Sequence, residues 1–193
     1  MIKVLDKFIA DKIAAGEVIE SIANVVKELI ENALDAGASQ IDITLEEAGM
    51  KRIHIVDNGS GMDSTDAKMA FLRHATSKIR TEYDLFHINS LGFRGEALPS
   101  IAAVSRVELI TSEGENAGTR VIVEDNIIQL IEPIGFRKGT SVDVTRLFYH
   151  TPVRFKYLKS VKHELQKSVD LVGKFALANS EVAFTLSNNN RKL

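Results

Sequence analysis

The sequence predicts an α/β fold in two layers, with a mixed, mostly antiparallel sheet in one layer and helices in the other. Three observations support this prediction: amphipathic helical segments, a hairpin pattern early in the chain, and a series of alternating apolar segments in its second half. The chain has 193 residues, 45% hydrophobic and 26% charged, which is enough to bury a core. No repeat or Pro- or Ser-rich linker divides it, so residues 1–193 are expected to form a single domain.

The first elements have clear local signals. Apolar residues recur at helical spacing from about residue 20 to 36, and Gly37 is placed to end that helix. Residues 41–45 and 52–56 then alternate between apolar and polar side chains, which predicts the two strands of a hairpin. Asp63 has the pattern of a helix N-cap, and that helix is expected to continue through Leu72.

The middle of the chain begins with an aperiodic stretch. Residues 75–93 have no clear period and are interpreted as a long functional loop. Alternation returns in four segments, which predict an antiparallel meander: residues 104–110, 119–123, 127–131 and 140–144.

Two helices and a strand complete the prediction. Thr151 followed by Pro152 is a strong helix start, and a second helix is expected from about Ser160 to Ala178. Residues 182–186 form a strand pattern followed by turn residues, and the chain stops shortly afterwards. Because a hairpin is begun without its second strand, we expect an N-terminal fragment of a longer protein, cut within or just before the following domain.

Composition narrows the class of protein. The chain has no cysteine, which excludes disulfides, thiolate zinc sites and cysteine nucleophiles. It lacks a signal peptide and any run of eighteen apolar residues, so a cytoplasmic protein without a membrane partner is expected. The net charge is −2, but residues 1–66 are acidic and residues 134–174 are basic. Basic side chains there either contact nucleic-acid phosphates or form a solvated helix face: Arg154, Lys156, Lys159, Lys162 and Lys167.

The polar side of the first helix is unusual. Glu28, Glu31 and Asp35 surround Asn32 at spacings where like charges repel, close to the helix end that disfavours acidic groups. Glu28 and Asn32 lie about 40° apart around the helix axis. The Asn32 amide oxygen can ligate a hard cation such as Mg²⁺, and the Glu28 carboxylate can orient and deprotonate a water. The alternative for this pair alone is a solvated helix face.

A glycine-rich turn follows the second strand of the hairpin. Asp57 can present a carboxylate to a donor, while Gly59 and Gly61 permit a ligand to approach the backbone. The alternative is an ordinary tight turn, for which Asn-Gly is common chemistry. Thr140, at the start of a later strand, could add a hydroxyl to a pocket.

Two segments in or beside the aperiodic stretch suit phosphate. Pro99 places a helix start at residues 96–98, so Gly92 to Gly95 precede free N–H groups that favour anions. The polar segment from Arg73 to Ile79 can fold over phosphates as a lid. The alternatives are a structural glycine loop and a surface loop.

Together and in this order, these motifs closely resemble the MutL family of DNA mismatch repair ATPases. That family belongs to the GHKL superfamily, with DNA gyrase B subunits, ninety-kilodalton heat-shock chaperones and histidine kinases. The resemblance spans residue 1 to about 160 and rests on five strings: Ile13-Ala-Ala-Gly-Glu-Val18, Val25-Val-Lys-Glu-Leu29, Arg73-His-Ala-Thr-Ser-Lys-Ile79, Gly92-Phe-Arg-Gly-Glu-Ala-Leu98 and Leu147-Phe-Tyr-His-Thr-Pro-Val-Arg154. It implies a two-layer α/β sandwich of the GHKL, or Bergerat, type.

The resemblance implies a role for each matching residue. Glu28 would be the general base, Asn32 would bind the Mg²⁺ that bridges the ATP phosphates, and Asp57 would accept from the adenine amino group. The other residues implied in nucleotide binding form the lid, the phosphate cradle and the rest of the pocket: Gly59, Gly61, Met62, Thr76, Ser77, Lys78, Gly92, Phe93, Arg94, Gly95, Glu96, Ala97, Leu98 and Thr140.

The implied function is ATP binding with slow, Mg²⁺-dependent hydrolysis to ADP and phosphate. In the family, nucleotide closes the lid and joins two such domains as a dimer. This dimer signals between a mismatch recognition protein and a downstream nuclease or helicase, with weak DNA binding through basic residues. If the protein is bacterial, it would be associated with the nucleoid. The alternatives are another GHKL enzyme and a non-catalytic DNA-binding module built on residues 137–167.

Two departures from the family pattern matter. The family usually has Arg-Pro-Ala-Ser where this chain has Ser21-Ile-Ala-Asn24, so any role of that arginine is lost and Ser21 or Asn24 could cap the helix instead. The family also places a catalytic lysine in a following domain that this chain does not contain. Hydrolysis by the chain alone is therefore expected to be slow or absent.

Overall fold

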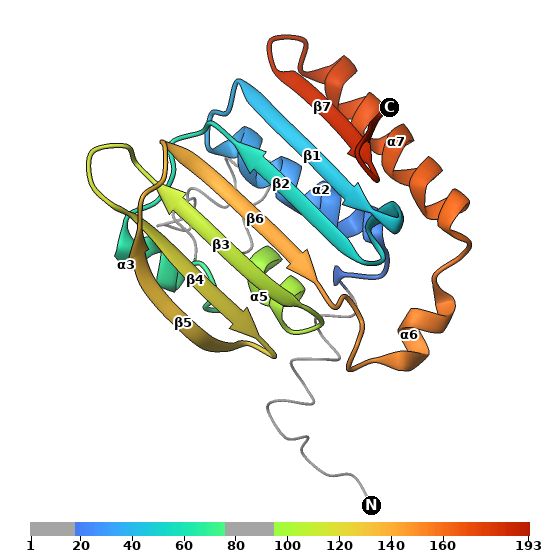
Figure 1. The fold of residues 1–193 in the computed structure, drawn as a ribbon, viewed down its shortest axis with the longest axis horizontal. Helices are drawn as coiled ribbons and strands as arrows, with labels where there is room; N and C mark the ends of the chain where they lie inside the picture. The colour runs from blue at the N-terminus through green and yellow to red at the C-terminus, as the bar shows by residue number, and fades with distance from the viewer. Residues whose placement is uncertain (1–17, 76–94) are drawn as a thin grey trace, which may run out of the picture.

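The computed structural model describes residues 18–75 and 95–193, and within them eight strands form one sheet. The strand order is β5-β4-β3-β6-β2-β1-β7-β8, antiparallel throughout except for the parallel pair of β1 and β7. In Figure 1, α2, α3 and α5 lie behind the sheet, and α7 packs against α2 and β7 at one edge. The predicted α/β class, with a mixed, mostly antiparallel sheet in one layer, is confirmed.

The strands are β1 Gln40–Glu46, β2 Arg52–Asp57, β3 Arg106–Ser112, β4 Gly118–Glu124, β5 Ile127–Ile134, β6 Gly139–Thr145, β7 Ala183–Asn188 and β8 Arg191–Lys192. The helices are α2 Ile22–Asp35, α3 Ser64–Met69, α5 Ala97–Ala102, α6 Pro152–Tyr157 and α7 Val161–Ala178, with a 3₁₀ turn, η1 Glu47–Gly49, inside the hairpin. The helix predicted through Leu72 ends at Met69. The stretch predicted as a long loop, residues 75–93, lies outside the described residues except for Ala75.

Helix α2 begins and ends as its sequence predicts. The Ser21 hydroxyl oxygen accepts from the backbone N–H of Asn24 at 3.3 Å, which makes Ser21 the N-cap. Gly37 has φ +69°, and the N–H groups of Gly37 and Ala38 donate back to carbonyls of the last turn, the Schellman arrangement. The apolar side is buried and orients the helix against the sheet: Ile22, Val25, Val26, Leu29, Ile30 and Ala33.

The two faces of the sheet differ in character. The face toward the helices is apolar, with Ile43 of β1 opposite Ile55 of β2, both buried. The other face carries ion pairs between strands, including Arg52 with Asp143. This polar outer face and apolar inner face follow from the alternation along each strand.

The predicted meander is correct for β3, β4 and β5 but wrong for β6. Strand β6 pairs with β3 on one side and with β2 on the other. Its inward side chains Val142 and Val144 are buried, whereas β5 contains Pro133 and lies at the edge of the sheet with exposed side chains. Pro removes a donor from the ladder, so β5 suits an edge and β6 suits the centre.

The C-terminal elements close the other edge. Helix α7 has the predicted bounds, and Ser160 caps it by accepting from the N–H of His163. Thr151 precedes Pro152 at the start of α6, although its hydroxyl donates to the Phe148 carbonyl and accepts no capping hydrogen bond from the helix. The hairpin partner that was expected to be missing is present as the two-residue β8. None of the helices within residues 18–75 and 95–193 is long and apolar enough to cross a membrane.

Candidate functional site

A row of buried polar side chains crosses one end of the sheet. The strand registers place Asp57 of β2 opposite Thr140 of β6, Thr140 opposite Thr111 of β3, and Thr111 opposite Thr119 of β4. All four are buried on the helix side of the sheet. The ends of β2 and β3 and the starts of β6 and β4 meet at this edge in Figure 1. Most other inward positions of these strands are aliphatic, so the row marks a polar site in an apolar layer.

Asp57 is the charged member of the row. Its side chain is only 7% exposed, and its Oδ1 accepts from the Gly59 N–H at 2.8 Å. Burial raises the pKa of Asp57 above the ordinary aspartate value, while hydrogen bonds from the backbone of Gly59 and Thr140 and the charge of Arg137 partly offset this. Because burial separates this carboxyl group from water, a ligand that donates a hydrogen bond to it is favoured.

The turn after Asp57 is clamped between two elements. A Cβ atom on Gly59 would lie 2.8 Å from the Cβ of Ala36, just beyond α2. Gly61 has φ +71°, and a Cβ there would overlap the Ser112 carbonyl oxygen at the end of β3. Close packing of the turn against Ala36 and Ser112 therefore requires glycine at both positions. This reason adds to the one expected from the sequence, which was the approach of a ligand to the backbone.

This turn also connects the row to the polar side of α2. The Ser60 N–H donates to the Ala36 carbonyl at 2.9 Å, and the Ala36 N–H donates to the Asn32 carbonyl at 3.0 Å. Asn32 and Glu28 are partly buried on the same helix. Two of the predicted groups, the acceptor Asp57 and the helix bearing Glu28 and Asn32, thus belong to one hydrogen-bonded unit.

Lys27 offsets the charge repulsion expected on α2. Its Nζ lies 3.2 Å from Glu28 Oε1 and 2.9 Å from Glu31 Oε2. Burial lowers the pKa of Lys27. Its hydrogen bonds to Glu31 and Glu28 and the charges of these two residues raise the pKa by more, so the net pKa lies above the ordinary lysine value. The acidic cluster is therefore partly neutralised by the chain itself.

The predicted phosphate cradle is described only in part. Helix α5 begins at Ala97, as Pro99 predicts, after Glu96 at the N-cap, and it contacts α2. The His74 N–H donates to the Gly95 carbonyl at 3.2 Å, and Leu98 packs against the core. The predicted residues that lie outside the described part of the chain are Thr76, Ser77, Lys78, Gly92, Phe93 and Arg94.

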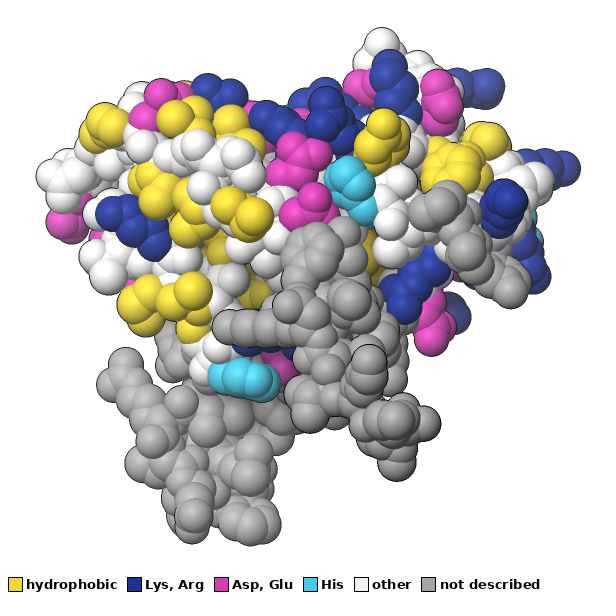
Figure 2. Space-filling model, turned by 90° about the horizontal axis from the view of Figure 1, so that it is seen from below, with side chains coloured by type: hydrophobic (Ala, Val, Ile, Leu, Met, Phe, Trp, Pro, Cys, Tyr) yellow, Lys and Arg dark blue, Asp and Glu magenta, His cyan; other side chains and the backbone are white. Residues whose placement is uncertain are grey.

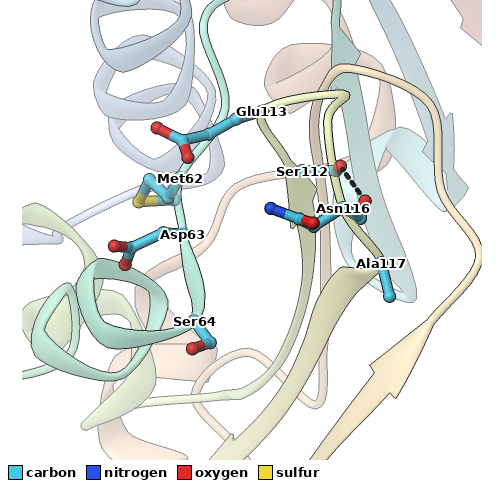
Figure 3. A pocket seen from close by; sticks show the side chains of 7 residues that line it. All are labelled: Met62, Asp63, Ser64, Ser112, Glu113, Asn116 and Ala117. Atoms are coloured by element: carbon cyan, nitrogen blue, oxygen red, sulfur yellow. Dashed lines mark hydrogen bonds between the residues drawn. The ribbon is translucent and has the colours of Figure 1, made fainter.

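A small pocket of about 150 Å³ lies beside the row. Figure 3 shows Met62, Asp63 and Ser64 on one side of it, facing Ser112 at the end of β3 and Asn116 in the β3–β4 turn. The Asp63 carboxylate already accepts from two N–H groups of α3, at 2.7 Å each. This pocket extends the site outward from Met62.

Sequence reasoning missed two residues of the site. Thr111 lies one residue beyond the strand predicted for 104–110, although the alternation of Val107 and Leu109 continues to it. Arg137 donates from Nη1 to the Asp57 carbonyl at 3.2 Å, and only the register of β6 brings it there.

Residues 19–129 match the family model described as histidine kinase-, DNA gyrase B-, and HSP90-like ATPase. The chain is 51% identical over 189 residues to the DNA mismatch repair protein MutL of Geobacillus thermodenitrificans, covering 98% of this chain and 29% of that protein. It is 52% identical over 185 residues to MutL of Listeria welshimeri, covering 96% and 31%. The chain therefore spans about a third of the length of these relatives.

Solved structures give the same result for the fold. The Aquifex aeolicus MutL ATPase domain complexed with ADP is 34% identical with a TM-score of 0.71, over 91% of this chain and 62% of that one. The N-terminal domain of a DNA repair protein is 29% identical with a TM-score of 0.80, over 95% and 54%.

Proposed function

Since this chain belongs to the histidine kinase-, DNA gyrase B- and HSP90-like ATPases and, within them, to the MutL family, we propose that it binds ATP at the row of buried polar side chains. The observation that carries the proposal is Asp57, a buried acceptor held in register with Thr140. Such an acceptor suits the amino group of adenine, which donates. The ADP complex of the Aquifex aeolicus domain supports this choice of ligand.

Helix α2 offers Mg²⁺ a suitable oxygen ligand. Asn32 is partly buried beside Glu28 and supplies an amide oxygen, the ligand type that Mg²⁺ prefers. Because Mg²⁺ usually keeps several waters and takes the remaining ligands from phosphates, a single amide oxygen from the chain is sufficient. The ion, when bound, would neutralise charge on the phosphates.

Glu28 is proposed as the general base for hydrolysis to ADP and phosphate. Lys27 holds its Oε1 at 3.2 Å, which orients the carboxylate so that the second oxygen can accept from the attacking water. Phosphoryl transfer depends mainly on such positioning and on charge stabilisation. Without the following domain, we expect turnover by this chain alone to be slow.

The proposal for hydrolysis is tested in protein that includes the following domain. Glu28→Ala is expected to retain ATP binding and lose turnover, while Asn32→Ala is expected to weaken Mg²⁺-dependent binding. Phosphate release and equilibrium binding are measured on the same preparations. Undiminished turnover in Glu28→Ala would remove Glu28 from the mechanism.

We further propose that nucleotide closes the lid at residues 76–78 and joins two domains as a dimer. This dimer would signal between a mismatch recognition protein and a downstream nuclease or helicase. Sedimentation of the longer protein with a non-hydrolysable ATP analogue tests this: a dimer should form with nucleotide and not without it. A sedimentation coefficient that does not change with nucleotide would contradict it.

DNA binding is proposed for five basic side chains on α6, on the first turns of α7 and between these helices, which lie to the right in Figure 2: Arg154, Lys156, Lys159, Lys162 and Lys167. Four of them are exposed: Lys156, Lys159, Lys162 and Lys167. Exposed lysines bind phosphates in a salt-dependent manner. A steep salt dependence of DNA binding together with no nucleotide binding would favour the alternative of a DNA-binding module.

A further inference from the structure

The Arg137 side chain connects the end of β2 to the start of β6. Its Nη1 atom carries two hydrogens and donates to the Asp57 carbonyl at 3.2 Å and to the Lys138 carbonyl at 3.1 Å. Its guanidinium also lies over the Phe136 ring, with Cζ 5.9 Å from the ring centroid. These contacts hold the head of an exposed side chain in one place, next to Asp57.

The backbone around this contact is closely packed. Gly139, the first residue of β6, has φ +122°, and a Cβ atom there would overlap the Asp57 carbonyl oxygen. Strand β6 also places Thr140 opposite Asp57. The carbonyl that Arg137 binds is therefore pressed between two strands, and the guanidinium has a fixed position relative to the buried carboxyl group of the same residue.

Arg137 supplies a positive charge to this carboxyl group. Burial raises the pKa of Asp57, and hydrogen bonds from the backbone of Gly59 and Thr140 lower it together with the charge of Arg137. Of the residues that the structure describes, Arg137 is the one whose charge lowers this pKa. The other charged side chains on the elements around the turn are Lys27, Glu28, Glu31 and Asp35 of α2, Asp42 of β1, Asp63 before α3, Glu113 after β3 and Lys138 before β6.

We propose that Arg137 is a positioning residue for the nucleotide base, which keeps the buried Asp57 side chain in the ionised form that accepts a hydrogen bond. This inference rests on the proposed function. An ionised carboxylate accepts from the amino group of adenine, whereas a protonated carboxyl group presents an O–H donor. Guanine carries a carbonyl group where adenine carries its amino group, so a protonated Asp57 would suit the wrong base. Arg137 thus extends adenine binding to lower pH than burial alone would permit.

The test uses three variants of this chain. Arg137→Gln removes the charge and keeps an N–H donor, and Arg137→Lys keeps the charge. Lys138→Gln is the matched control, because it removes the neighbouring exposed cation. Both positions are exposed, so the variants are expected to fold; if Arg137→Gln does not, Arg137→Met takes its place. An NMR titration of the Asp57 carboxyl carbon is recorded on each ligand-free chain, and calorimetry measures the affinity for Mg²⁺–ADP over the same pH range.

We expect Asp57 of the Arg137→Gln chain to titrate at higher pH than in the wild type, because loss of the positive charge makes the ionised form less stable. The fall in ADP affinity on acidification should begin at a correspondingly higher pH. Asp57 should titrate close to the wild-type pH in Arg137→Lys and at the wild-type pH in Lys138→Gln.

Three results would overturn the inference while leaving the proposed function intact. One is an Asp57 that titrates at the same pH in Arg137→Gln and in the wild type. Another is an equal shift in Lys138→Gln, because that would be a general effect of net charge. The third is a shift in Arg137→Lys as large as that in Arg137→Gln, because the charge would then not be responsible. A wild-type chain that binds no ADP would overturn the proposed function itself, whatever the NMR titration shows.

Discussion

Replacing Asp57 with asparagine is expected to affect the stability of the folded chain and its affinity for ADP in different ways. The variant keeps the size of the side chain and an oxygen that can accept from the N–H groups of Gly59 and Thr140, but it removes the charge. Because burial raises the pKa of Asp57, the ionised carboxylate is less stable in the folded chain than in the unfolded chain. We therefore expect the ligand-free Asp57→Asn chain to unfold at a temperature no lower than that of the wild type.

The same variant should bind ADP more weakly than the wild type. A hydrogen bond to a charged group contributes about 1.5–3 kcal/mol, so the loss corresponds to a roughly 10- to 150-fold weaker affinity. Titration calorimetry with Mg²⁺–ADP measures it. Asp143→Asn is the matched control, since it breaks the ion pair with Arg52 on the outer face of the sheet and should leave the affinity unchanged. An Asp57→Asn chain that binds ADP as tightly as the wild type would refute the assignment of Asp57 as the acceptor.

The remaining predictions concern pH, charge and backbone geometry. The ADP affinity of the wild type should fall as pH falls through the raised pKa of Asp57, because protonation removes the acceptor, and Asp57→Asn should lack this step; identical pH profiles would contradict this. Lys27→Met should weaken ADP binding more at low salt than at high salt, since two carboxylates lose their cation, and a salt-independent difference would argue against it. Gly61→Ala should lower the free energy of unfolding in urea by at least about 1–2 kcal/mol, whereas Gly135→Ala, with open space at its Cβ, should not; equal effects would be inconsistent with the clamped turn. Ser21→Ala should cost about 1 kcal/mol in the same assay without changing ADP affinity, and an unchanged stability would show that the cap is unimportant.

The starts of α2 and α3 and the end of α2 were predictable because their chemistry is local. Ser21 accepts from an N–H three residues ahead, and Asp63 accepts from N–H groups two and three residues ahead. Gly37 satisfies carbonyls of the turn that it ends. Such groups must be paired at every helix end, so short patterns in the sequence are sufficient to locate them.

The strand order was not predictable in the same way. Alternation identifies β6 as a strand but does not say which strands it joins, and it pairs with β3 and β2 instead of β5. The parallel pairing of β7 with β1 likewise joins segments that are far apart in the sequence, and α7, which precedes β7, packs against it. Register across a sheet follows from burial of the whole layer, which no single segment contains.

The site contains residues that the sequence could predict from local patterns and residues that depend on the pairing of distant strands. The motif residues Asp57 and Gly61 have local signatures, and the structure joins their turn to α2. Thr111 has no such signature, because its partners Met62 and Thr140 lie 49 and 29 residues away in the sequence. Its place in the site is visible only once β3 and β6 are in register.

The central claim is that the buried end of the sheet binds an adenine nucleotide, and titration of the wild-type chain with Mg²⁺–ADP tests it most directly. We expect saturable binding at one site, a melting temperature that rises with ADP concentration, and weaker binding of Mg²⁺–GDP. No heat of binding and no change in melting temperature with ADP would contradict the claim.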